Sequence, residues 1–114
     1  MKFSASSLLA LTSSAAAFSG QFSTWYEGGG EGPGILHIYV TDYSTGSTYE
    51  GRDYDGSLSS QGKEISFVET SDGDYSWNAS VWVTSDGCFN IDFQGAFGVG
   101  HGYCCGGFPC NLSA

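Results

Sequence analysis

The sequence predicts an all-β protein: an antiparallel β-sandwich or a small barrel of about seven short strands with two disulfides. Two observations support this prediction. Runs of aromatic and β-branched residues recur along the 114-residue chain between turns that contain glycine. The tripeptide Ser-Asp-Gly also occurs twice, at residues 71–73 and 85–87, between alternating apolar residues, which is a strong hairpin signal.

The N-terminus has the pattern of a secretory signal peptide. A basic residue precedes a short apolar run at residues 7–11, and three alanines at residues 15–17 form a small-residue cleavage pattern. We therefore expect residues 1–17 to be removed and residues 18–114 to form a single secreted domain. Cleavage after Ser19 and an uncleaved N-terminal helix are the alternatives. The apolar run is too short to span a bilayer.

The secreted part is strongly acidic. The whole chain has a formal charge of −9, and loss of Lys2 with the signal peptide makes it −10 for the remaining 97 residues. A chain with this charge is repelled by nucleic acid and by anionic lipid surfaces, so we predict neither nucleic acid nor a membrane as a partner. The charge also favours a soluble monomer.

Three strands are predicted in the N-terminal half, at residues 21–26, 35–42 and 48–54. Residues 27–34, between the first two strands, are mostly glycine with one proline, so we expect an irregular connection. This connection has no Lys-Ser/Thr pair and no strand-to-helix context, which excludes a phosphate-binding loop.

Four further strands are predicted in residues 63–104, joined by three turns. With a three-residue Ser-Asp-Gly turn, Val83 pairs with Phe89 and Ile65 pairs with Ala79, so apolar residues share one face. A two-residue Asp-Gly turn would instead pair Val83 with a polar residue. We therefore predict the three-residue turn at both places.

The third turn is predicted to be centred on Ala96, which pairs Phe93 with Val99 and sets Cys88 opposite Cys104. This register divides the sheet into two faces. The predicted core face consists of Ile65, Phe67, Tyr75, Trp77, Ala79, Val81, Val83, Phe89, Ile91, Phe93, Val99, His101 and Tyr103. The predicted polar face consists of Ser76, Asn78, Ser80, Trp82, Thr84, Asn90, Asp92, Gln94, Gly98, Gly100 and Gly102.

All four cysteines follow the signal peptide, so we predict two disulfides. The register favours Cys88–Cys104 together with Cys105–Cys110. The crossed pairing, Cys88–Cys105 with Cys104–Cys110, is the second choice, and a strained vicinal Cys104–Cys105 bridge is the third. The spacing lacks two separated Cys-x-x-Cys pairs, so no zinc site is predicted, and the sequence indicates no other metal and no cofactor.

Two tripeptides match the N-glycosylation pattern, at Asn78 and at Asn111. We predict both as glycosylation sites. Asn78 lies on the predicted polar face, so a glycan there requires that face to be open to solvent.

A ligand site is predicted on the polar face around Trp82. In the predicted register Asn90 lies opposite Trp82, and Asp92 and Gln94 follow on the same face. An exposed indole ring stacks on a sugar, while amides and carboxylates hydrogen-bond its hydroxyls, so these four residues predict glycan binding. The alternative is that Trp82 packs beneath a second sheet or beneath a loop of the cysteine cluster.

No catalytic residue is predicted. His37 and His101 have no serine or cysteine nucleophile in a recognisable motif, and His101 is expected to be a buried, hydrogen-bonded structural residue. Acids that would serve a glycoside hydrolase are limited to Asp53, Asp55, Asp72, Asp74 and Asp92. No pair among them stands out, so the chain is predicted to be non-enzymatic. Weak calcium binding is an alternative role for these acidic loops.

Two resemblances extend the functional prediction. Tyr49-x-x-x-x-Tyr54-x-Gly56 resembles the aromatic-x4-aromatic-x-Gly signature of βγ-crystallin domains, which implies a small crystallin-like antimicrobial toxin or inhibitor. The signal peptide, short acidic chain, β-rich pattern and late cysteine cluster resemble small secreted cysteine-containing effector proteins of fungi. That resemblance implies a non-enzymatic domain that binds a host protein or a glycan. The sequence therefore predicts a binding protein first, a toxin or inhibitor second, and a glycoside hydrolase third.

Overall fold

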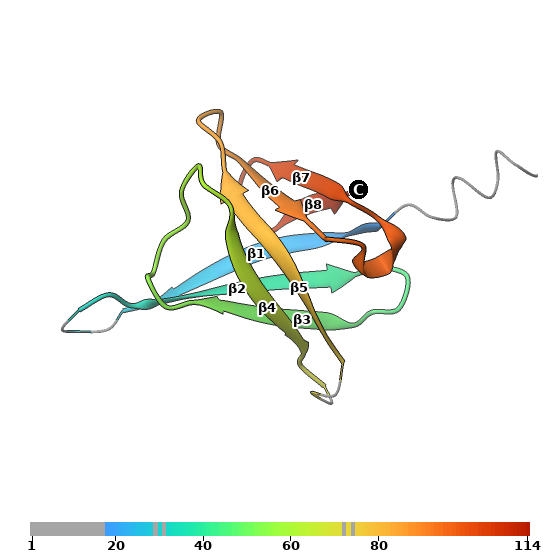
Figure 1. Ribbon diagram of the computed structural model, residues 1–114, viewed down its shortest axis with the longest axis horizontal. Coiled ribbons are helices and arrows are strands. Elements are labelled where there is room, and N and C mark those ends of the chain that lie inside the picture. The colour runs from blue at the N-terminus through green and yellow to red at the C-terminus, as the bar shows by residue number, and fades with distance from the viewer. Residues whose placement is uncertain (1–17, 29, 31, 72, 74) are drawn as a thin grey trace, which may run out of the picture.

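The computed structural model describes residues 18–28, 30, 32–71, 73 and 75–114. The predicted signal peptide, Asp72 and Asp74 therefore lie outside the described residues. The chain forms a closed antiparallel barrel (Figure 1). Its strands are β1 (Ser19–Glu27), β2 (Ile35–Asp42), β3 (Thr48–Asp53), β4 (Lys63–Glu69), β5 (Ser76–Val83), β6 (Cys88–Asp92), β7 (His101–Cys105) and β8 (Cys110–Ser113).

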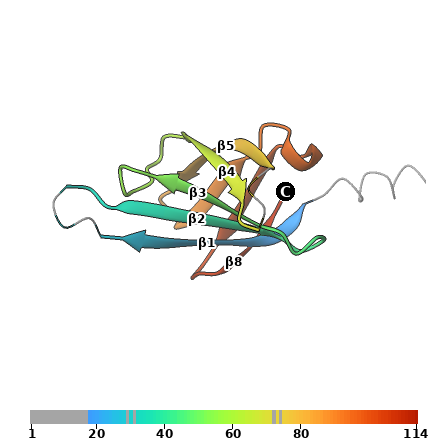
Figure 2. The ribbon, with the colours of Figure 1, turned by 90° about the horizontal axis from the view of Figure 1, so that it is seen from below.

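Every strand pairs with its neighbour in sequence, and β8 pairs with β1 to close the barrel. The paired ends of β1 and β2 extend beyond the body of the barrel (Figures 1 and 2). This confirms the predicted all-β class, with the barrel as the architecture. The sequence analysis missed β8, because this short strand follows the cysteine cluster without a hairpin turn signal before it. Within the part of the chain that the structure describes, no helix is long and apolar enough to cross a membrane.

Both Ser-Asp-Gly turns have the predicted register. Ile65 pairs with Ala79 between β4 and β5, and Val83 pairs with Phe89 between β5 and β6. The glycine that ends each turn has a positive φ, 73° at Gly73 and 87° at the second turn, a conformation that residues with a Cβ rarely adopt. These two hairpins place the core side chains of three strands in phase.

Side-chain hydrogen bonds explain why the second turn forms. The Oδ1 of Asp86 accepts hydrogen bonds from the hydroxyl of Thr84 at 2.5 Å and from the amide of Cys88 at 3.2 Å. These two bonds hold the pKa of Asp86 below its usual value. The amide of Thr84 also donates to the carbonyl of Cys88 at 3.0 Å, so the turn closes through interactions within five residues.

The predicted pairing across the third turn is wrong by one residue. Asp92 pairs with His101, and Cys88 pairs with Cys105 where the prediction paired it with Cys104. Because side chains alternate along a strand, a shift of one residue turns every β7 side chain to the face opposite the predicted one.

The extra residue in this turn follows from Phe97, which lies in the short 3-10 turn η1 (Ala96–Gly98) and has a φ of 60°. The centroid of its ring lies 5.1 Å from that of Phe18 and 5.2 Å from that of Trp77. Packing this ring against two others offsets the cost of its positive φ. The local sequence pattern contains no sign of this packing.

The disulfides are Cys88–Cys105 and Cys104–Cys110. The preferred prediction, Cys88–Cys104 with Cys105–Cys110, is therefore wrong, and the crossed pairing is correct. The one-residue shift is the reason. It sets Cys105 opposite Cys88 in the ladder and buries Cys104, which is then linked to Cys110 of β8. Two disulfides are typical of proteins in extracellular or other oxidising compartments.

The barrel interior holds most of the predicted core. Its buried members are Ile65, Phe67, Trp77, Ala79, Val81, Ile91 and Phe93. The predicted core residues Val83, Phe89 and Val99 are partly buried. The remaining core comes from other strands, through Phe18, Phe22, Ile38, Val40, Tyr49 and Leu112.

Three predicted core residues, Tyr75, His101 and Tyr103, are exposed, so their assignment to the core is wrong. His101 and Tyr103 are exposed because the shifted register of β7 turns them outward. Tyr75 precedes the first residue of β5 and lies outside the alternating pattern of that strand.

Candidate functional site

Three rings lie together on the outer face of β5 and β7. Trp82 lies on β5, and His101 and Tyr103 lie two residues apart on β7. The His101 ring is nearly parallel to both neighbours: its centroid is 5.6 Å from that of Trp82 at 12°, and 6.3 Å from that of Tyr103 at 17°. We call Trp82, His101 and Tyr103 the aromatic row.

Asn90 of β6 supports the aromatic row from beneath. It pairs with both Trp82 and Tyr103 in the ladder, and only 8% of it is exposed. The Nε2 of His101 donates to the Oδ1 of Asn90 at 2.8 Å, and the Nδ2 of Asn90 donates to the carbonyl of Cys88 at 3.4 Å. The predicted ligand-binding residue Asn90 therefore orients the His101 ring.

The other predicted site residues, Asp92 and Gln94, lie at the turn after β6. Asp92 is half-buried and pairs with His101, so its carboxylate borders the aromatic row. Its Oδ1 accepts a hydrogen bond from the amide of Gln94 at 3.1 Å. The exposed side chain of Gln94 donates from Nε2 to Glu64 of β4 at 3.0 Å. The structure therefore gathers Trp82, Asn90 and Asp92 and directs Gln94 toward β4.

The aromatic row is more open at its β7 end than at Trp82. Trp82 is half-buried, and a Cβ added at Gly62 would lie 3.7 Å from its indole ring, so the loop before β4 lies against it. His101 is exposed, and 55% of Tyr103 is exposed. The surface available to a ligand therefore depends most on two residues that the sequence analysis assigned to the core.

A groove lies on another part of the outer surface, between β3 and β4. The described pairs of these strands are Tyr49–Glu69 and Glu50–Val68, and toward Asp53 the strands diverge (Figure 1). The resulting groove has a volume of about 430 Å³ and is lined by Glu50, Arg52, Tyr54, Ser66, Val68, Glu69 and Thr70. The sequence analysis missed it, and the only available signal was the run of outward residues Glu50, Arg52 and Tyr54.

Beside the groove, His37 of β2 is held between two carboxylates. Its Nδ1 lies 2.6 Å from Oε2 of Glu50 on β3, and its Nε2 lies 2.9 Å from Oε1 of Glu27 on β1. An ionised carboxylate only accepts hydrogen bonds, so both contacts together require both ring nitrogens to donate, as they do in the imidazolium form of His37. Its side chain is 9% exposed, and its ring centroid lies 5.0 Å from that of Trp25.

The pKa values of His37 and Glu50 are shifted by this geometry. Hydrogen bonds to Glu27 and Glu50 raise the pKa of His37 above its usual value. Burial opposes ionisation of Glu50, but hydrogen bonds from His37 and Arg52 outweigh burial and lower the pKa of Glu50. The Nε of Arg52 donates to Oε2 of Glu50 at 3.2 Å. This network links β1, β2 and β3 along the surface that borders the groove.

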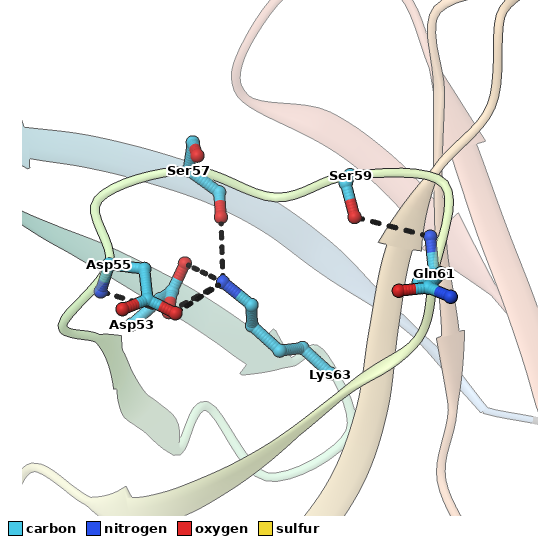
Figure 3. Close-up of polar contacts among 6 residues, drawn as sticks. All are labelled: Asp53, Asp55, Ser57, Ser59, Gln61 and Lys63. Carbon is cyan, nitrogen blue, oxygen red and sulfur yellow. Dashed lines mark hydrogen bonds and ion pairs between the residues drawn. The ribbon is translucent and has the colours of Figure 1, made fainter.

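Asp53 and Asp55, two of the acids that a glycoside hydrolase would use, both bind Lys63 (Figure 3). The Nζ of Lys63 lies 3.0 Å from Oδ2 of Asp53, 3.2 Å from Oδ2 of Asp55 and 3.0 Å from the carbonyl oxygen of Ser57. We call these contacts the lysine clasp. They tie the loop of residues 54–62 to both diverging strands, so the two acids have a structural role.

The lysine clasp also compensates the burial of Asp53, of which 4% is exposed. A buried carboxylate requires a charged partner because burial removes its hydration. Burial would lower the pKa of Lys63, but hydrogen bonds to Asp53 and Asp55 outweigh it and raise the pKa above its usual value.

Both predicted glycosylation sites are exposed on the outer surface, Asn78 on β5 and Asn111 on β8. The Oδ1 of Asn78 accepts a hydrogen bond from the hydroxyl of Ser66 at 2.6 Å. The Oδ1 of Asn111 accepts one from the hydroxyl of Tyr43 at 2.9 Å. In both residues these bonds use the amide oxygen, whereas a glycan is attached to the amide nitrogen.

The residues that resemble the βγ-crystallin signature point to different sides of the barrel wall. Tyr49 is buried in the core, whereas Tyr54 is exposed beside the groove. Gly56 has a φ of 82°, and a Cβ there would lie 3.3 Å from the ring of Tyr26.

No protein-family model, curated protein or solved structure matches this chain. The described part of its outer surface carries the aromatic row on β5–β7 and the groove between β3 and β4.

Proposed function

We propose that the chain is a secreted, non-enzymatic β-barrel domain that binds a glycan in the extracellular space through the aromatic row. The observation that carries this proposal is the near-parallel arrangement of Trp82, His101 and Tyr103 on the outer surface. Sugar rings pack their C–H faces on aromatic rings, and a row of rings suits successive sugars of a polymer. The carboxylate of Asp92 borders the row and accepts hydrogen bonds from sugar hydroxyls.

A glycan fits the aromatic row better than a protein partner does. A stable protein interface buries roughly 800 Å² on each partner around an apolar centre. The aromatic row is narrower than such a centre, because the polar residues Ser80, Thr84 and Asp92 share its face. A host protein is therefore the alternative partner, and the binding test distinguishes the two.

Cleavage after Ala17 is supported by Phe18, the first residue after that site. Its ring packs 5.0 Å from that of Phe93, and its amide and carbonyl exchange hydrogen bonds with Ala114 at 3.0 and 3.1 Å. Cleavage after Ala17 keeps this core residue, whereas cleavage after Ser19 removes it. The intact mass of protein recovered from the culture medium should correspond to a chain that begins at Phe18. A chain that begins at Gly20, or retention inside the cells, would contradict the proposal.

The lysine clasp supports the non-enzymatic part of the proposal, because it occupies Asp53 and Asp55. The resemblance to secreted effector proteins of fungi supports a ligand of host origin. The resemblance of residues 49–56 to βγ-crystallin domains supports an antimicrobial toxin as the alternative. Killing of competing microbes by the purified protein would favour that alternative.

Binding to immobilised glycans and insoluble polysaccharides tests the proposal. We expect binding to at least one of them and roughly tenfold weaker binding by Tyr103→Ala, since a lost aromatic contact is worth up to about 1.4 kcal/mol. Tyr75→Ala is the matched control, because Tyr75 is also an exposed tyrosine but lies outside the aromatic row. It should bind as strongly as the unchanged protein.

Absence of binding to every glycan would overturn the proposal, and so would an equal loss in both tyrosine variants. A protein partner captured through Tyr103 would replace the glycan as the ligand. Trp82→Ala adds a second measurement, but Trp82 is half-buried, so its circular dichroism spectrum must first match that of the unchanged protein.

A further inference from the structure

The β3–β4 groove has the size of a small-ligand site. Its volume of about 430 Å³ lies within the range of about 300–1,000 Å³ that is usual for small-molecule pockets. The groove is open to the outer surface, because Tyr54 and Val68 in its lining are exposed. It is separate from the aromatic row, which lies on β5 and β7.

The lining of the groove combines the groups that a sugar ring requires. Tyr54 and Val68, which are 63% and 39% exposed, offer apolar surface for the C–H face of a ring. Arg52 supplies hydrogen-bond donors, Glu50 and Glu69 supply acceptors, and Ser66 and Thr70 supply hydroxyls that do both. Every hydroxyl of a pyranose is both a donor and an acceptor. The donors and acceptors of the groove can therefore bind the hydroxyls around a pyranose ring.

Glu50 is held in place before any ligand arrives. Its Oε2 accepts hydrogen bonds from Nδ1 of His37 and from Nε of Arg52. Both bonds use the same oxygen, so Oε1 can accept from a ligand. Binding to a side chain that is already ordered costs less conformational entropy than binding to a mobile one.

The charges of the groove select a neutral ligand. The lining contains the cation Arg52 together with the acids Glu50 and Glu69, so neither a polycation nor a polyanion meets a uniform surface of the opposite sign. The formal charge of −10 on residues 18–114 further disfavours an acidic ligand. A neutral, hydroxyl-rich molecule is repelled neither by the mixed charges of the groove nor by the negative charge of the chain.

We propose that the β3–β4 groove is a second carbohydrate site, which takes one or two pyranose rings of a neutral saccharide. Tyr54 stacks on the ring, and Glu50, Arg52 and Glu69 bind its hydroxyls. This extends the proposed glycan-binding function to a second surface and does not depend on the aromatic row.

The test is a titration of the folded, isotope-labelled protein with cellobiose, mannobiose and N,N′-diacetylchitobiose, followed by amide chemical shifts in nuclear magnetic resonance spectra. At least one disaccharide should shift the amides of residues 50–54 and 66–70. Tyr54→Ala should weaken this binding roughly tenfold. Tyr103→Ala should leave it unchanged, because Tyr103 lies in the aromatic row.

A charge-matched pair of variants tests the polar contacts. Glu69→Gln should weaken the groove shifts several-fold, whereas Glu64→Gln, which changes the charge of the same strand outside the groove, should not. A galacturonic acid dimer, which is acidic, should produce no groove shifts.

Three outcomes would overturn the second site: no groove shifts with any neutral disaccharide up to its solubility limit, groove shifts that persist in Tyr54→Ala, or groove shifts produced only by a basic peptide. Shifts confined to the aromatic row would also overturn it while supporting the proposed function. Shifts confined to the groove would support the second site and contradict the role of the aromatic row.

Discussion

The β4–β6 hairpins and the cysteine end formed by β6–β8 fix their strand pairing in different ways. In the hairpins, a Ser-Asp-Gly turn with a left-handed glycine sets each register, and the strands pair along most of their length. At the cysteine end, β7 is linked by a disulfide to β6 on one side and to β8 on the other. The described pair of β7 with β8 is Tyr103–Ser113.

This difference shows that a small barrel can close its sheet by more than one kind of interaction. Closure matters because an open strand edge invites pairing with other chains. Turn chemistry closes the hairpins locally, whereas covalent links and the packing of Phe97 close the cysteine end. Different substitutions should therefore destabilise the two regions: loss of a disulfide at the cysteine end, and loss of a turn glycine in the hairpins.

The largest expected effect comes from breaking the cysteine end. Cys88→Ala together with Cys105→Ala should lower the free energy of unfolding by about 3 kcal/mol, because the bridge closes a loop with a sequence separation of 17. Urea unfolding followed by circular dichroism measures the loss. Reductant should destabilise the unchanged protein at least as much. An unchanged urea midpoint in the double variant would show that the cysteine end does not depend on this bridge.

The β3–β4 junction is held in a third way, by a salt bridge between the two strands where they diverge. Lys63→Met should lower the free energy of unfolding by about 2 kcal/mol, since it leaves the buried carboxylate of Asp53 without its partner. Adding Asp53→Asn should recover part of the lost stability, because it removes the unpaired charge. Equal, additive losses in a double-mutant cycle would mean that the two residues do not interact.

A smaller effect is expected from the turn that sets a hairpin register. Gly87→Ala should cost about 1 kcal/mol, because Gly87 has a φ of 87°. Gly100→Ala is the matched control: its φ is not in the left-handed region, and no atom lies within 4 Å of the added Cβ. Its stability should change by less than about 0.5 kcal/mol. Equal losses in both variants would contradict the role of the turn glycine.

The smallest expected effect is a pH dependence of stability that comes from His37 of β2, outside both the hairpins and the cysteine end. Because the pKa of His37 is raised in the folded protein, its stabilising contribution is complete below pH 6.5, the usual histidine value. The contribution is lost as the pH rises through the raised value. The thermal midpoint should therefore fall on raising the pH, and His37→Gln should remove that part of the slope.

The titration of His37 itself gives a direct check by nuclear magnetic resonance. Its midpoint should lie above 6.5, and Glu27→Gln should lower it because the largest raising contact is lost. A midpoint below 6.5 would contradict the donor assignment of both ring nitrogens.

The sequence alone determined the all-β class, both Ser-Asp-Gly registers and the outward position of Trp82. These features follow from turn chemistry and from alternation along single strands, which act over a few residues. The same local logic failed at Ala96, where a packed ring lengthens the turn. That one residue moved His101 and Tyr103 from the predicted core to the aromatic row.

Only the tertiary structure decided the cysteine pairing, the aromatic row and the β3–β4 groove. Each depends on residues that are distant in sequence. Phe97 meets Phe18 across the barrel, and His37 meets carboxylates from two other strands. The pattern of one segment carries no information about which distant side chain will face it, so these contacts appear only when all eight strands are in place.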